Sequence, residues 1–137
     1  MKIIGISEYK CFTIKLENGG LTSSINIWNP LNLYGNEFNI GDTLNPKAEW
    51  KNMHDAILNN KEYRLDINQN STSLMIDCTG EKITFSSIPD ASEHNMINIT
   101  LSLDENKEEL LKVFRSLLNN LNMFPSRKDS DFIIEIR

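Results

Sequence analysis

Cysteine is scarce in this chain of 137 residues, and no apolar run is long enough to cross a bilayer. The two cysteines, Cys11 and Cys78, fall in predicted strands and lack the spacing of a disulfide framework. The opening run Met1–Ile6 is too short for the apolar region of a signal peptide. We therefore expect two reduced, partly buried thiols in a cytoplasmic protein with no membrane partner.

Catalytic motifs are missing as well. The sequence has no glycine-rich phosphate loop, no nucleophile elbow, and no histidine or cysteine pair at zinc-binding spacing. His54 stands beside Asp55 in a predicted helix, and we interpret it as a helix-surface residue. The Asp90–His94 loop combines a histidine, two carboxylates and a hydroxyl, so a small-molecule or ligand site there is an alternative to a solvated loop. We expect no catalytic residue, no metal and no cofactor.

Positive charge is in short supply. The chain has 14 lysines and arginines against 19 acidic residues, a net charge of −5 and a pI near 5.0. This balance disfavours nucleic acid or an anionic membrane as the partner and suits a basic protein.

Hydrophobic residues make up 39% of the chain, as in folded domains, and no linker or repeat divides it. We expect one domain over residues 1–137.

The strongest helical pattern spans Ser102–Phe124. Its apolar residues recur at helical spacing, and polar residues fill the opposite side. Two capping-box signals compete for its start, Ser102 with Glu105 and Asn106 with Glu109, and Pro125 limits its end.

A second helix is predicted from Asn45–Pro46 to about Asn59. Asparagine is a favoured cap, and proline is favoured at the first helical position. Trp50, Met53 and Ile57 would face the core.

Strand patterns fill the rest of the chain. Alternating apolar and polar residues predict strands near 1–6, 10–17, 21–28, 62–67, 73–78, 83–85, 97–103 and 132–137, with a brief one near 37–40. Tight turns such as Asn18–Gly20 favour antiparallel pairing of consecutive strands. We predict an α+β fold with a single antiparallel, meander-rich sheet and two helices packed on one face. Phe132, Ile134 and Ile136 of the last strand would point inward, so a chain truncated before Phe132 should misfold.

The other face of this sheet is predicted to be solvated. We expect the turn near residues 68–71 to pair Tyr63 with Ile76 and Leu65 with Leu74 across the two strands that it joins.

This register would set Glu62 opposite Asp77, and Arg64 opposite Met75. Like charges directly across a sheet repel, and the simple alternative to a binding role is that salt and the nearby Lys82 screen the pair. The functional hypothesis is an acidic spot, with an adaptable methionine, that meets a basic partner.

Two aromatic residues extend this hypothesis. Trp28 falls on the outward side of its strand, and Tyr34 follows in an irregular segment, so an exposed aromatic patch is as plausible as a loop that buries both. The partner-binding residues predicted from the sequence are therefore Glu62, Arg64, Asp66, Met75, Asp77, Trp28 and Tyr34.

In general character this short, acidic α+β chain without catalytic motifs resembles the immunity proteins encoded beside bacterial polymorphic toxins, including those of contact-dependent growth inhibition. The many Asn, Ile and Lys residues are also typical of an AT-rich bacterial gene. The resemblance covers the whole chain and rests on no motif, so no residue role is transferred. It implies a cytosolic protein that binds and neutralises a basic toxin domain, often a nuclease. The alternatives are a small-molecule enzyme or ligand-binding domain that uses the Asp90–His94 loop, and a non-catalytic subunit of a larger assembly.

Overall fold

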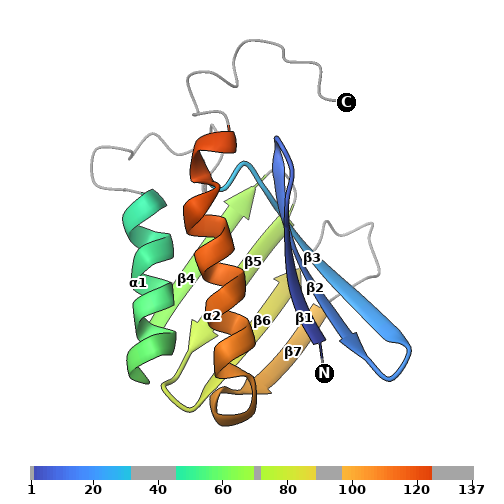
Figure 1. Cartoon of the computed structure of the whole chain (residues 1–137), viewed down its shortest axis with the longest axis vertical. Coiled ribbons are helices and arrows are strands. Elements are labelled where there is room, and N and C mark those ends of the chain that lie inside the picture. Colours follow the sequence, from blue (N-terminus) through green and yellow to red (C-terminus); the bar gives the residue numbers. More distant parts are fainter. Residues whose placement is uncertain (1, 32–45, 70–71, 89–96, 125–137) are drawn as a thin grey trace.

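The computed structural model describes residues 2–31, 46–69, 72–88 and 97–124, and it has an α+β architecture (Figure 1). In chain order its elements are β1 (Lys2–Ser7), β2 (Cys11–Asn18), β3 (Leu21–Trp28), α1 (Pro46–Asn59), β4 (Tyr63–Gln69), β5 (Thr72–Cys78), β6 (Lys82–Ile88), β7 (Ile97–Ser102), α2 (Leu103–Asn119) and the short 3-10 helix η2 (Leu121–Met123). The predicted fold class is confirmed.

The described strands form two antiparallel sheets where the sequence predicted one. One sheet has the order β1-β2-β3 and the other β4-β5-β6-β7, so each is a meander. The hairpin between β2 and β3 uses Gly19 and Gly20 at φ values of 58° and 90°, as its sequence predicted. No tight turn joins β3 to β4, because residues 32–45 and helix α1 intervene, and the chain begins a second sheet there.

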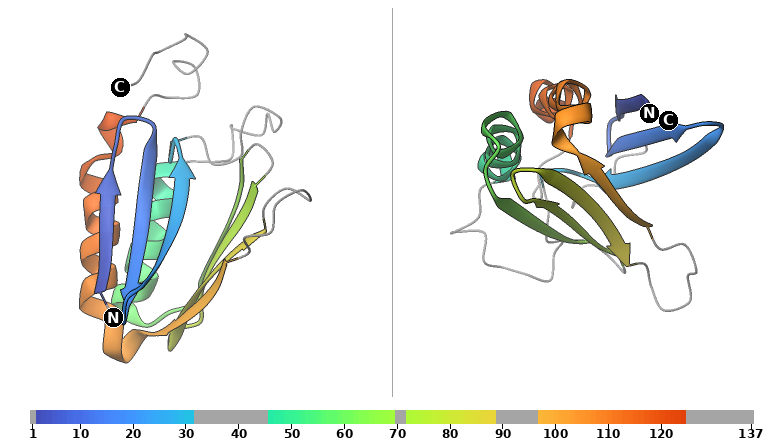
Figure 2. Two further views of the ribbon diagram at one scale, coloured as in Figure 1. Left: turned by 90° about the vertical axis from the view of Figure 1, so that its right-hand side faces the viewer. Right: turned by 90° about the horizontal axis from the view of Figure 1, so that it is seen from below.

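Both helices lie side by side over one face of the four-stranded sheet (Figures 1 and 2). Helix α1 contacts β4 and β5, whereas α2 contacts β7 and also packs along β1 of the other sheet. Helix α2 therefore joins the two sheets into one core. The prediction that the helices share one face is confirmed.

Helix α2 begins at the first of the two predicted start signals. Ser102 is the N-cap residue, with extended backbone and no capping bond from its own side chain. Asn106, the competing signal, is buried inside the helix and donates from Nδ2 to the Ser102 carbonyl at 2.9 Å. The helix ends at Asn119, and η2 continues the chain to Met123, so the final turn of the predicted helix is tighter than α-helical.

Helix α1 buries the residues predicted to face the core. Trp50, Met53 and Ile57 are fully buried, and the Trp50 ring lies 6.3 Å from that of Phe114 on α2. Lys107 of α2 donates from Nζ to the carbonyl of Leu58 at 3.3 Å, near the C-terminal end of α1. A cation there offsets the negative end of the helix dipole.

The core contains the inward residues of both sheets and the apolar stripes of both helices. Cys11 and Cys78 are free and buried, as expected. At Gly5 the packing leaves no room for a side chain, because an added Cβ would lie 2.8 Å from the Phe12 ring and 3.3 Å from Val113. Leu21, at the hairpin end of β3, lies outside this core and is 78% exposed.

Some remaining predictions can be compared with the observed strand boundaries, and others fall on residues that the structure does not describe. Residues 86–88 belong to β6, which extends beyond the strand predicted near 83–85. The predicted strands near 37–40 and 132–137, Asn45, Tyr34 and the Asp90–His94 loop lie outside the described residues. Within the described ranges, no helix combines the length and apolar character needed to span a membrane.

Candidate functional site

The four-stranded sheet has one apolar face and one polar face. Its inward side chains are buried against the helices, and alternate residues point the other way. No described helix or strand covers that second side (Figure 2). We call it the polar outer face and define it by Arg64, Asp66, Asn68, Ser73, Met75, Asp77, Lys82, Thr84, Ser86, Asn98 and Thr100.

The cross-strand register differs by two residues from the predicted one. Arg64 lies opposite Asp77, and Asp66 lies opposite Met75. The predicted pairs of Glu62 with Asp77 and of Arg64 with Met75 are therefore wrong. In the observed register β4 runs to Gln69 and β5 starts at Thr72, so only two residues join them.

The same shift applies to the inward face. Tyr63 pairs with Cys78, and Leu65 pairs with Ile76. A shift of two keeps every side chain on its own face, so both registers satisfy the apolar pattern. The observed register also replaces a like-charge pair by an opposite-charge pair, Arg64 with Asp77, which is favourable across a sheet.

The charges of the polar outer face are concentrated on β4 and β5. Arg64 Nε donates to both carboxylate oxygens of Asp66 at 3.2 Å, and both side chains are more than half exposed. Asp77 is half-buried opposite Arg64, and Met75 is half-buried opposite Asp66. Arg64 and Lys82 therefore balance Asp66 and Asp77, so the face is mixed in charge, with two cations and two carboxylates.

The β6 and β7 side of the polar outer face carries mainly hydroxyl and amide groups. The hydroxyls of Thr84 and Thr100 hydrogen-bond across the two strands at 2.9 Å. At the opposite end of the sheet the Ser73 hydroxyl donates to Asn68 Oδ1, also at 2.9 Å. Neutral hydrogen-bonding groups therefore flank the charged residues, both on β6 and β7 and at the Asn68–Ser73 end of β4 and β5.

Glu62 does not belong to this face. It precedes β4 and is exposed, and it lines a shallow groove of about 230 Å³ beside helix α1, together with Asn52, Asp55, Ala56, Asn59, Lys61 and Tyr63. Next to the groove the Tyr63 hydroxyl donates to the carboxylate of Glu49. The structure thus separates Glu62 from Asp77, which the sequence had paired.

Trp28 lies in the other sheet. It is 52% exposed and stands opposite Cys11 across β2 and β3. Its predicted outward orientation is confirmed, but it shares no sheet with Arg64, Asp66, Met75 and Asp77. The predicted site residues therefore occupy at least two separate surfaces, with Tyr34 outside the described residues.

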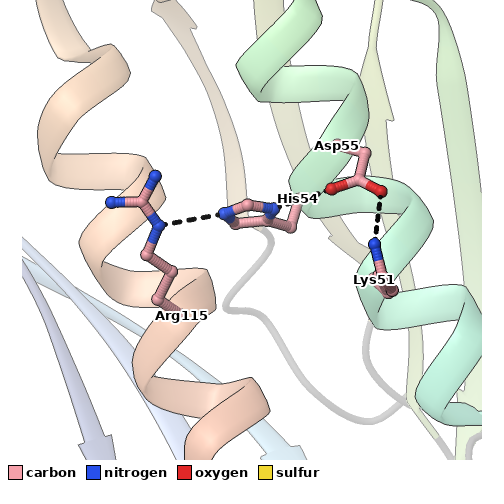
Figure 3. Close-up of polar contacts among 4 residues, drawn as sticks. All are labelled: Lys51, His54, Asp55 and Arg115. Atoms are coloured by element: carbon pink, nitrogen blue, oxygen red, sulfur yellow. Dashed lines mark hydrogen bonds and ion pairs between the residues drawn. The ribbon is translucent and has the colours of Figure 1, made fainter.

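Sequence reasoning missed a polar cluster between the two helices (Figure 3). His54 Nδ1 lies 3.0 Å from Asp55 Oδ1, and Arg115 Nε of α2 donates to His54 Nε2 at 3.2 Å. Lys51 Nζ donates to the other Asp55 oxygen at 2.9 Å. The hydrogen bond with His54, followed by that from Lys51, holds the pKa of the Asp55 carboxyl below its ordinary value. The spacing of Lys51 and Asp55 was visible in the sequence, whereas the contact with Arg115 spans 61 positions and had no local signal.

His54 is also less exposed than a helix-surface residue, because its side chain keeps only 12% of its accessible area. Within residues 2–31, 46–69, 72–88 and 97–124, no three His, Cys, Asp or Glu side chains gather as metal ligands would. Burial raises the pKa of the Cys11 and Cys78 thiols, which disfavours the thiolate needed for a nucleophile.

Fold and site together define an α+β protein with one open, mixed-charge sheet face. Comparison with protein-family models, with curated proteins and with solved structures found no match to this chain.

Proposed function

We propose that this is a cytoplasmic bacterial immunity-type protein that binds and neutralises a basic toxin domain, such as a nuclease. The observation that carries the proposal is the open polar outer face, where Asp66, Met75 and Asp77 lie on adjacent strands with no described element over them. The net charge of −5 supports attraction of a basic partner.

The contact would be centred on β4 and β5. Met75 supplies an adaptable apolar contact between the carboxylates. A basic residue of the toxin would compete with Arg64 for Asp66, since that ion pair is exposed and held by one nitrogen. Long-range attraction would speed encounter, and the neutral groups of β6 and β7 would fix orientation.

The test measures association with the toxin domain that the proposal expects to be encoded beside this gene. The double variant Asp66→Lys/Asp77→Lys should slow association at least about tenfold and flatten its salt dependence. The control Glu8→Lys/Glu17→Lys changes net charge by the same amount but lies in the three-stranded sheet and its turn. Equal rates for the wild type and the Asp66/Asp77 variant would discard this face.

Toxin neutralisation needs its own readout. Co-expression of the wild-type chain should restore growth of cells that produce the neighbouring toxin, and the Asp66/Asp77 variant should restore it less. A basic non-cognate protein such as lysozyme should bind the wild type only weakly and lose that binding in moderate salt. Failure of the wild type to restore growth would refute the immunity proposal.

A second candidate function is that of a subunit in a larger assembly. Its support is Trp28, a large aromatic side chain that is half exposed on the three-stranded sheet. The mass of the purified protein in solution tests self-assembly. An oligomer that Trp28→Ser dissociates and Leu21→Ser does not would favour this function.

A further inference from the structure

His54 is held by both helices at once. Its Nδ1 is hydrogen-bonded to Asp55 on its own helix, α1, and its Nε2 accepts from Arg115 on α2 (Figure 3). The side chain is largely enclosed. Each ring nitrogen therefore has a partner, and the two partners belong to different helices.

These partners define the protonation state of the ring. An arginine Nε–H can only donate, so His54 Nε2 must be an acceptor and carry no proton. The single ring proton then lies on Nδ1 and is donated to Asp55 Oδ1 at 3.0 Å. In this arrangement His54 is neutral, and Arg115 and Asp55 select the same tautomer.

A second proton on the ring would affect the two partners in opposite ways. It would occupy Nε2, remove the acceptor of Arg115 and set two cations 3.2 Å apart. The bond to Asp55 would become an ion pair, in which the carboxylate also serves Lys51. Lys112 lies three positions before Arg115 on α2 and is exposed.

We propose that His54 is a proton-operated latch between α1 and α2. Neutral His54 ties the helices together through Arg115, and protonated His54 stays with Asp55 and releases Arg115. The latch borders the contact of Trp50 with Phe114. Trp50 lies one turn before His54 on α1, and Phe114 lies one residue before Arg115 on α2. Protonation of the ring would therefore loosen this edge of the helix pair. The latch is independent of the proposed toxin binding.

Nitrogen NMR tests the proton position directly. The variant His94→Gln leaves His54 as the only histidine of the two in the chain. At pH 8 the ring should show the Nδ1–H tautomer, which is the less common form of free histidine. On acidification the Arg115 Nε–H signal should move with the same midpoint as the His54 ring. An Nε2–H tautomer, or an Arg115 signal that stays unchanged while His54 titrates, would overturn the proposal.

Fluorescence of Trp50 tests the structural consequence. In a Trp28→Phe background, Trp50 is the only tryptophan, and its emission should change with the midpoint of His54. His54→Asn keeps a donor for Asp55 but cannot titrate, so the change should be lost. Lys112→Gln removes an exposed cation of α2 that takes no part in the latch, so the change should persist. Persistence of the emission change in His54→Asn, or its loss in Lys112→Gln, would contradict the latch. If His54→Asn does not fold, the NMR measurement is the test of the proposal.

Discussion

The indole N–H of Trp50 donates to the carbonyl oxygen of Pro30 at 2.9 Å inside the core. Trp50 belongs to α1, which covers the four-stranded sheet, and Pro30 follows β3 of the other sheet. This hydrogen bond therefore joins the two sheets, between which the described strands form no pairing.

Replacing Trp50 tests the importance of that bond. Trp50→Phe keeps an aromatic ring but leaves the Pro30 carbonyl without its donor, and an unsatisfied buried group costs about 1–3 kcal/mol. Urea unfolding followed by circular dichroism should show a lower free energy of unfolding by at least that amount. Trp28→Phe, at a half-exposed position, is the control and should cost about 0.5 kcal/mol or less. Equal losses in the two variants would contradict the role assigned to the bond.

The close approach of β1 to Phe12 gives a second prediction. Gly5→Ala would place a Cβ 2.8 Å from the Phe12 ring and 3.3 Å from Val113. Overpacking of this kind typically costs about 1–3 kcal/mol, measurable by urea unfolding. In the double variant Gly5→Ala/Phe12→Leu the smaller side chain relieves the clash. The double variant should therefore lose less free energy of unfolding than the sum of the losses in the two single variants. Strict additivity would indicate that the clash is absent.

Local signals account for what the sequence predicted well. The apolar stripe and the start signal at Ser102 predict α2, and alternation assigns the faces of β4 and β5. Alternation repeats every two residues, so it could not choose between the predicted register and the one that sets Arg64 opposite Asp77.

Long-range relationships had no such signal. The contact of Arg115 with His54 and the division into two sheets depend on how distant segments pack. The sequence pattern of each segment is the same whether its strand extends one sheet or begins another. The open polar face was therefore predictable, whereas the interhelical cluster was not.

The observed register can be tested by exchanging charges. Asp77→Lys would set two cations opposite each other on β4 and β5, which should cost about 0.2–1 kcal/mol. Adding Arg64→Glu restores an opposite pair, so the double variant should regain most of the loss. Thermal unfolding at low salt gives the coupling between the two sites. If Arg64 lay opposite Met75, as the sequence alone suggested, the two substitutions would show little coupling.

Asp55 makes stability depend on acid pH. Its pKa is lowered mainly by the hydrogen bond with His54 and then by the one from Lys51, so folding favours the charged carboxylate. The stabilisation is present above the ordinary value of 3.8 and is lost as pH falls through the lowered value. Asp55→Asn should therefore be less stable than the wild type at neutral pH, with a gap that narrows below about pH 4.

Lys51→Gln is the matched variant for this experiment. It removes only the second of the two causes, so its stability gap should be smaller than that of Asp55→Asn over the same pH range. Unfolding curves in urea from pH 7 to pH 3 would give both gaps. A gap for Asp55→Asn that does not change with pH would contradict the lowered pKa.

The two buried cysteines contribute to the loss of stability expected at alkaline pH. Burial raises the pKa of both thiols above 9.0, and the Cys78 thiol donates to the carbonyl of Lys61 at 3.3 Å. Folding therefore favours the neutral thiol, so the stabilisation is complete below the unfolded value and is lost as pH rises through the raised one. Above about pH 9 the wild type should lose stability more steeply than Cys78→Ala.

Iodoacetamide should label both thiols slowly in the native protein and rapidly in urea, and rapid native labelling of Cys78 would show that its thiolate is accessible after all.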